Sequence, residues 1–101
     1  MIARMWKGYA SGANVGAYLE HFEQAVLPEL SRLDGFQGAT VLRRDRDGDS
    51  ELTVITLWES MDAIRRFAGD AVEVAVVAPA AQAVLRAYDT TVTHHEVLLK
   101  T

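Results

Sequence analysis

The hydrophobic pattern of the chain opens with a run typical of a β-strand. Residues Ile2–Tyr9 are rich in aromatic and large apolar side chains. The next segment, Ser11-Gly12-Ala13-Asn14, interrupts that pattern. The side chains of Ser11 and Asn14 can accept hydrogen bonds from free helical N–H groups, so either residue is a candidate N-cap for a following helix.

A helical pattern follows this break. Apolar residues recur at spacings of three and four, as expected for one buried helix face: Val15, Leu19, Phe22, Val26 and Leu30. Pro28 has no N–H to donate and crowds the turn before it, so we expect the helix to bend or stop at this residue. The pattern predicts a main helix over residues 14–27 and a looser turn through Arg32.

Two β-rich runs separated by a tight turn occupy the middle of the chain. The runs cover Gln37–Arg46 and Glu51–Glu59, and the Asp47-Gly48 pair between them favours a hairpin because such turns need positive φ. The second run carries apolar side chains on both sides: Leu52, Val54 and Trp58 on one, Ile55 and Leu57 on the other. We expect this strand to be buried on both faces.

The C-terminal part predicts two helical segments and a final strand. Ser60 is placed to cap a helix over Met61–Ala68. The run Ala71–Ala78 is ambiguous, because its valines favour a strand whereas its alanines favour a helical turn. Residues Ala80–Ala87 are typical of a helix, and Tyr88–Leu99, rich in Thr and Val, is predicted to be a strand.

These elements give the order β-α-β-β-α-β and predict an α+β fold built on one sheet. Right-handed crossovers would place both helical segments on one face of the sheet. The other face would then lack cover, although the strand Glu51–Glu59 is apolar on both sides. At about 25 cal/mol per Å² of apolar surface, exposing that face would cost several kcal/mol, so we expect a homodimer with sheet packed on sheet.

Composition narrows the class of protein. The chain has 101 residues, and we expect residues 1–101 to form a single domain. With 10 basic and 14 acidic residues the formal net charge is −4, which disfavours a nucleic-acid partner. The absence of Cys excludes disulfides, a thiolate nucleophile and Cys-ligated metals. We find neither a signal peptide nor a membrane-spanning run, so we expect a cytoplasmic protein without a membrane partner.

Three local segments carry a family resemblance. They are Thr56–Ser60 with the following Ala63–Asp70, the closing Val92–Val97, and Gly35–Gly38. Together they resemble the antibiotic biosynthesis monooxygenase family of the dimeric α/β-barrel superfamily. The resemblance implies a ferredoxin-like chain whose antiparallel sheet pairs with a second copy to form a barrel, with a pocket between sheet and helices in each subunit. It also implies an oxidoreductase that oxidises polycyclic phenols or quinols with O₂ and without a metal or flavin cofactor.

Some relatives of this family degrade haem, and that activity is a poor match to the sequence. The haem-degrading branch has a Trp and a His at positions that correspond here to Phe67 and Val77. Val77 cannot ligate iron, and none of the three His lies nearby in the sequence. The resemblance therefore implies an aromatic or quinol-like small molecule as substrate rather than haem.

His94 and His95 are candidates for catalysis. Neighbouring residues of a strand point to opposite faces, so the two side chains cannot chelate one metal. We expect one of them to face the pocket and the other to face the subunit interface or the rim. A partly buried neutral His can act as general base towards a phenolic substrate, and we assign this role to His94. The alternative is a hydrogen-bonded structural His.

Arg4 is the second catalytic candidate. It lies between apolar neighbours in the first predicted strand, where a charge is costly unless it is paired or borders a cavity. Its guanidinium could stabilise a phenolate or enolate oxygen of the substrate. It could equally pair with a carboxylate on an adjacent strand, such as Glu96. The sequence leaves both alternatives open.

Aromatic side chains are the candidates for substrate binding. We expect five of them to meet between the helices and the sheet: Trp6, Tyr18, Phe22, Trp58 and Phe67. By the resemblance they would clamp a flat substrate, whereas the simpler interpretation is ordinary hydrophobic core. His21 lies on the flank of the helical apolar stripe, where it would either line the pocket mouth or be solvated.

No metal site is predicted. The segment Asp45–Asp49 looks like a calcium loop, but an EF-hand needs Gly and Glu where this chain has Ser50 and Thr56. We interpret the segment as a hairpin turn. The three His come from distant elements and lack the spacing of metal ligands.

Two functions remain open on the sequence. The first is a cofactor-independent monooxygenase in which His94, or a water held by it, takes a substrate proton, the substrate carbanion reduces O₂, and Arg4 or Trp58 stabilises the negative charge. The second is a non-catalytic dimeric barrel that binds an apolar metabolite or serves as an accessory protein. Fold alone does not decide between them.

Overall fold

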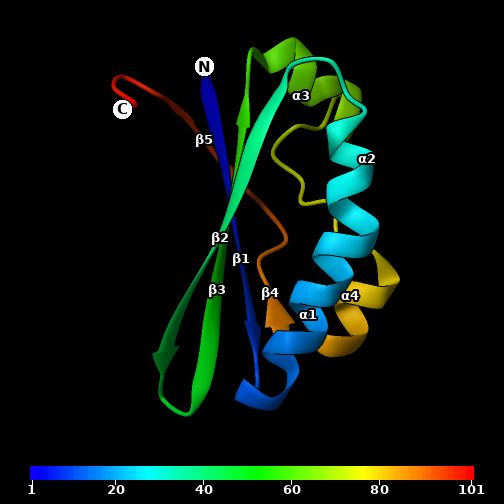
Figure 1. Ribbon diagram of the computed structural model, residues 1–101, viewed down its shortest axis with the longest axis vertical. Coiled ribbons are helices and arrows are strands. Elements are labelled where there is room, and N and C mark those ends of the chain that lie inside the picture. Colours follow the sequence, from blue (N-terminus) through cyan, green and yellow to red (C-terminus); the bar gives the residue numbers. More distant parts are fainter.

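A computed structural model describes residues 1–101 and shows one antiparallel sheet whose helices all lie against the same face (Figure 1). The strands are ordered β2, β3, β1 and β4, and β5 also pairs with β1. Their bounds are β1 Ile2–Ala10, β2 Phe36–Arg46, β3 Asp49–Trp58, β4 Ala87–Tyr88 and β5 Thr93–Glu96. The predicted α+β class and the β-α-β-β-α-β order are confirmed.

The hairpin between β2 and β3 forms where the sequence predicts it. Arg46 pairs with Asp49, so only Asp47 and Gly48 form the turn. Their φ angles are 52° and 82°, the pair of positive values that this type of two-residue hairpin requires. Strand β3 therefore begins two residues earlier than the predicted Glu51.

The first helical region changes its geometry along its length and stays helical to Ser31, where a looser turn is predicted after residue 27. A 3₁₀ turn, Gly12–Asn14, leads into α1 (Val15–His21), a π-helical segment (Phe22–Val26) and α2 (Leu27–Ser31). The N-cap prediction for this region is wrong, because neither candidate side chain makes a capping hydrogen bond. The chain instead enters the helix through the 3₁₀ turn.

The helix does not stop at Pro28, which was one of the two outcomes expected there. The N–H of Leu27 donates to the carbonyl of Phe22, five residues back, which widens the turn immediately before Pro28. Pro28 then occupies the first turn of α2, where its missing N–H costs little. The π-helical segment thus accommodates the proline without ending the helix, and Phe22 and Val26 from it line the pocket described below.

The second helical region is divided into two short helices. Helix α3 (Met61–Ala68) is capped as predicted, since the Ser60 hydroxyl accepts from the N–H of Ala63 at 3.2 Å. Helix α4 (Pro79–Val84) ends three residues before the predicted Ala87. The ambiguous run before α4 forms neither a helix nor a regular strand, and residues 71–78 form turns and irregular backbone.

The prediction of one continuous last strand is wrong. The backbone leaves the sheet between β4 and β5 and pairs with the irregular segment before α4. The N–H of Val92 donates to the carbonyl of Glu73 at 2.8 Å, and the N–H of Ala75 donates to the carbonyl of Thr90 at 2.9 Å. These hydrogen bonds hold the irregular segment against the sheet, over the first strand.

The core fills the space between helices and sheet, and the opposite face of the sheet is uncovered (Figure 1). The largest completely buried side chains are Trp58, Leu30, Leu52 and Ile64. Strand β3 directs Leu52 and Trp58 towards the helices and alternates Ile55 and Leu57 onto the uncovered face, where both are half-buried. The two-sided apolar strand thus contributes one side to the core and leaves the other side without helical cover.

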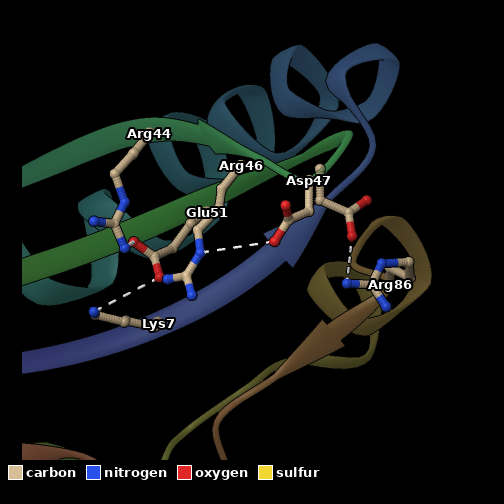
Figure 2. Close-up of polar contacts among 7 residues, drawn as sticks. Lys7, Arg44, Arg46, Asp47, Glu51 and Arg86 are labelled. Carbon is tan, nitrogen blue, oxygen red and sulfur yellow. Dashed lines mark ion pairs between the residues drawn. The ribbon is translucent and has the colours of Figure 1, made fainter.

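Charged residues gather at the hairpin end of the uncovered face (Figure 2). The carboxylate of Glu51, in β3, lies 2.9 Å from the guanidinium of Arg44 and 3.7 Å from the ammonium of Lys7. Arg86 pairs with Asp49 and so ties the segment after α4 to the hairpin. The uncovered face is therefore apolar at its centre and ionic at one end. None of the helices has the length and hydropathy needed to cross a bilayer.

Candidate active site

A pocket lies between the sheet and the first helical region. Twelve of its fifteen lining residues are hydrophobic, and the three others are Arg4 from β1, Thr56 from β3 and His21 from α1. Its empty space is about 590 Å³, part of which is open to solvent. Val76 lines it and is 55% exposed, so the pocket reaches the surface beside the irregular segment before α4. No carboxylate lines the pocket.

A row of aromatic rings forms one wall of this pocket. Tyr18 stacks on Trp6 with ring centroids 6.2 Å apart and on Phe22 with centroids 6.4 Å apart. The indole N–H of Trp6 is held by the carbonyl of Asp89 at 2.8 Å, which fixes the ring. Burial raises the pKa of Tyr18 to about 12, so its phenol stays protonated at neutral pH. The wall is therefore aromatic and uncharged at neutral pH.

Arg4 brings the one permanent charge into the pocket. Its side chain is buried, with 5% of the residue exposed, and its guanidinium donates to the carbonyls of Val72 at 2.6 Å and Val74 at 3.1 Å. The ring of Phe67 lies 5.8 Å from the guanidinium carbon. Three of the five guanidinium N–H groups are used, counting the contact with His94 described next, so two remain.

The predicted alternative in which Arg4 pairs with Glu96 is wrong. Glu96 lies opposite Ile2 in the register, and no ion pair joins Arg4 to a carboxylate. Backbone carbonyl oxygens take the place of a carboxylate as partners of Arg4, because the irregular segment before α4 passes over β1 at this residue. Burial without a counter-charge lowers the pKa of Arg4, although a guanidinium remains charged at neutral pH. Its positive charge is thus left without an anionic partner.

His94 lies beside Arg4 but does not line the pocket. Its Nε2 is 3.0 Å from a guanidinium nitrogen of Arg4. Because a guanidinium can only donate, Nε2 must accept, and the proton of the neutral ring lies on Nδ1. Burial, and then the charge of Arg4, lower the pKa of His94. His95 points to the opposite face, with its Nε2 2.8 Å from the hydroxyl of Thr93.

His21 does line the pocket. It is the last residue of α1, directly before the π-helical segment, and its ring lies 6.5 Å from that of Tyr18. Its Nε2 is buried and has no hydrogen-bond partner in the protein. This is the one buried side-chain nitrogen or oxygen left unsatisfied in the chain. A ligand in the pocket would be its natural partner.

Trp58 supports the pocket from behind. It is completely buried between Phe36 and Phe67, with ring centroids 5.3 Å and 5.6 Å away, and it is absent from the pocket lining. Its indole N–H donates to the hydroxyl of Thr56 at 2.8 Å, which fixes the side chain of this pocket-lining residue. Phe67 lines the pocket directly.

The structure thus brings together six of the eight residues predicted for the site: Arg4, Trp6, Tyr18, His21, Phe22 and Phe67. It places His94 and Trp58 behind them. Sequence reasoning missed Thr56, for which the neighbouring Trp58 was the only signal. It also missed the backbone carbonyls that hold Arg4, which no side-chain pattern encodes. No three His, Asp or Glu side chains are grouped as metal ligands.

The family model of antibiotic biosynthesis monooxygenase matches residues 1–72. No curated protein matches the sequence significantly. A crystal structure from Bacillus cereus that carries the same family description is similar over 100% of this chain and 94% of its own, at 17% identity and a TM-score of 0.69.

Two characterised proteins share the fold. The heme-degrader MhuD from Mycobacterium tuberculosis, with two hemes bound in its active site, is 22% identical with a TM-score of 0.62, over 100% of this chain and 99% of its own. SnoaB, a cofactor-independent oxygenase from Streptomyces nogalater, is 21% identical with a TM-score of 0.53, over 99% and 95%. At such identities these likenesses concern the fold, whereas the family model covers most of the sequence. The chain belongs to the antibiotic biosynthesis monooxygenase family.

Proposed function

We propose that the protein is a cofactor-independent monooxygenase that oxidises a hydroxylated aromatic or quinol-like molecule in this pocket. One observation carries the proposal. The buried guanidinium of Arg4 has no carboxylate partner and borders an aromatic, carboxylate-free cavity. Such a cavity favours a flat ligand that is, or becomes, an anion. SnoaB, which is similar in fold, is described as a cofactor-independent oxygenase.

The proposed chemistry needs only the substrate and O₂. Loss of a proton from the substrate leaves an electron-rich anion, and Arg4 stabilises its negative charge. The anion transfers one electron to O₂, the resulting radical pair combines into a peroxide anion, and this anion takes back the proton removed in the first step to form a hydroperoxide. Loss of water from the peroxide leaves a carbonyl group. Overall a ring CH₂ group and O₂ become C=O and H₂O, so one oxygen atom enters the product and the other leaves as water.

Heme is not proposed as the substrate. The positions that hold a Trp and a His in the haem-degrading branch are occupied here by Phe67 and Val77, and both line the pocket with apolar surface. These side chains offer contact area for an aromatic ring but no iron ligand.

We also propose that two copies pair through the uncovered face of the sheet. Ile55 and Leu57 lie half-buried on that face together with Met5, and no helix of this chain covers them (Figure 1). Burying such a surface against a second copy would remove apolar area from water and leave the charged hairpin end at the rim. The occupant is then a second copy of the chain, as the two-sided pattern of β3 predicts.

Oxygen consumption tests the proposed function. The protein is mixed with a panel of anthrones, naphthols and hydroquinones, and O₂ uptake is recorded with an oxygen electrode against heat-denatured protein. We expect uptake with at least one compound, and one atom of ¹⁸O₂ in the product by mass spectrometry. We expect Arg4→Gln to lower kcat/KM by about a hundredfold, since one charged group opposite the developing anion is lost.

Two results would contradict this function. Binding of these compounds without O₂ uptake would indicate a binding or accessory protein instead. Uptake that Arg4→Gln leaves unchanged would place the reaction outside the pocket. A catalase control distinguishes water from hydrogen peroxide as the reduced product.

A further inference from the structure

We propose that His21, rather than His94, is the group that accepts the proton of the ligand hydroxyl. This inference rests on the proposed function for its ligand class, a hydroxylated aromatic molecule. The sequence pattern indicated only that His21 would line the pocket or be solvated. The assignment therefore adds a catalytic residue, located on the helical side of the pocket.

The unsatisfied Nε2 of His21 is the first argument. A buried nitrogen without a partner costs free energy, and such atoms are rare in native proteins unless a ligand or water completes them. The nitrogen belongs to a residue that lines the pocket, and the neighbouring ring of Tyr18 is part of the aromatic wall. A ligand hydroxyl beside that wall would supply the missing partner once the imidazole turns its buried Nε2 towards the pocket.

The second argument is that His94 is already engaged. Its Nε2 accepts from Arg4 at 3.0 Å, so the lone pair needed for proton abstraction is occupied. It is also absent from the pocket lining, whereas His21 is present. Among the three His, His21 alone lines the pocket, and its Nε2 is a buried ring nitrogen without a partner in the protein.

The proton transfer balances without any further reactant. The O–H bond of the ligand breaks, its electron pair stays on the oxygen, and the proton forms an N–H bond at Nε2 of His21. The products are a phenolate and an imidazolium. Arg4 lines the same pocket from the sheet side, and its charge favours the phenolate. The pocket thus contains one group that takes the proton and one that stabilises the anion.

A coloured phenol tests the assignment without turnover. The probe is 4-nitrophenol, whose phenolate is yellow and whose neutral form is colourless, at a pH below its own pKa. Quenching of tryptophan fluorescence measures total binding, and visible absorbance measures the ionised fraction. We expect wild-type protein to bind the probe and turn it yellow. We expect His21→Leu to weaken binding about 3- to 10-fold, the loss of one hydrogen bond.

The variant His21→Gln separates hydrogen bonding from proton transfer. Its amide can hydrogen bond to the hydroxyl but cannot take a proton, so we expect binding within about threefold of wild type and no yellow colour. The matched control His95→Gln removes an imidazole that lies outside the pocket, and we expect wild-type binding and colour. Thermal unfolding of each variant verifies that it is folded.

Yellow colour that persists in both His21 variants would overturn the assignment, as would equal binding of the probe by wild type and His21→Leu. A heme spectrum that forms with hemin and disappears in His21→Leu would also overturn it, because Nε2 would then be an iron ligand. Failure of the proposed function gives a different result. In that case no O₂ is consumed with any substrate, while the ionisation of 4-nitrophenol still depends on His21.

Discussion

Arg4 donates to Nε2 of His94 across 3.0 Å, although 90 positions separate the two residues in the sequence. The same guanidinium nitrogen lies 2.6 Å from the carbonyl of Val72. One side chain of the first strand therefore joins the last strand and the irregular segment before α4. That segment supplies one wall of the pocket, so Arg4 both contributes charge to the pocket and holds its wall in place.

Replacing Arg4 should destabilise the protein through this wall. In Arg4→Met the carbonyls of Val72 and Val74 and the ring of His94 lose their donor, and we expect a loss of about 2–3 kcal/mol of unfolding free energy. Urea unfolding measures the loss, and hydrogen exchange should show faster amides in residues 72–78. We expect Arg4→Lys to recover little, because one ammonium cannot reach three acceptors at once. Full recovery by Lys would contradict the bridging role.

The stability of the fold should fall with His94 protonation at mildly acidic pH. Burial and Arg4 lower the pKa of His94 below its ordinary 6.5, and the carboxylate of Glu73 opposes this only in part. As the pH falls, the unfolded chain therefore takes up this proton before the folded chain does. The stabilisation of the folded state by neutral His94 is complete above about pH 6.5. It is lost as the pH falls through the lowered pKa of His94 in the folded chain.

Urea midpoints between about pH 7.5 and 5 test this dependence. We expect His94→Gln, whose amide oxygen can still accept from Arg4, to flatten the slope relative to wild type. The variant His95→Gln should flatten the slope much less, because His95 makes only the smallest contribution to the lowered pKa of His94. Equal slopes for wild type and His94→Gln would show that the proton uptake occurs elsewhere.

The fold was largely predictable, since it depends on local patterns. The hairpin turn at Asp47 and Gly48 needs positive φ at two successive positions, and the Ser60 cap depends on its own following turn. The break in the last strand was not predictable in this way. It depends on backbone pairing of Val92 with Glu73, and backbone groups are the same at every residue.

The site was predictable in its residues but less so in their roles. The helical spacing brought Tyr18 and Phe22 to the sheet, as expected of an amphipathic helix. Which His has a free nitrogen depends on what the other nitrogens contact. That information comes from the Arg4–His94 contact across distant strands and from the helix geometry around His21, and neither has a sequence signature.

Alkaline conditions should destabilise the protein through Tyr18. Burial raises its pKa to about 12 from an ordinary value of 10.0, so the unfolded chain loses this proton first as the pH rises. The contribution of the protonated Tyr18 phenol to the free energy of unfolding is complete below about pH 10 and decreases between pH 10 and 12. We expect Tyr18→Phe to show a shallower loss of unfolding free energy over this range in urea titrations. A slope unchanged by Tyr18→Phe would contradict the burial of the phenol.

The apolar side chains of the uncovered face should determine whether the protein is a dimer in solution. We expect a dimer of twice 11.1 kDa in sedimentation equilibrium, and Ile55→Lys should increase the dissociation constant about a hundredfold or more, because it buries an unpaired ammonium in the interface. The control Gln24→Lys places the same charge on an exposed helical position and should leave the mass unchanged. A wild-type mass of 11.1 kDa at micromolar concentration would contradict the dimer.

Two glycines should respond in opposite directions to the same substitution. Gly35 has φ +91°, and a Cβ there would lie 2.6 Å from the Cβ of Ala63 in α3. We therefore expect Gly35→Ala to cost about 2–4 kcal/mol, from backbone strain and from displacement of α3. Gly16 is exposed within α1, and a Cβ added there would meet no atom within 4 Å outside its own helical backbone, so Gly16→Ala should add about 0.5–1 kcal/mol.

Comparing Gly35→Ala with Gly16→Ala separates the effect of close packing at Gly35 from the general effect of adding a methyl group to a glycine. Urea unfolding of both variants under the same conditions gives the two free energies on one scale. Because Ala63 is the residue whose N–H is capped by Ser60, Gly35→Ala should also loosen the start of α3, seen as faster amide exchange there. A Gly35→Ala variant as stable as wild type would mean that α3 can move away from the turn at Gly35 without cost, and the close contact would then not fix the helix.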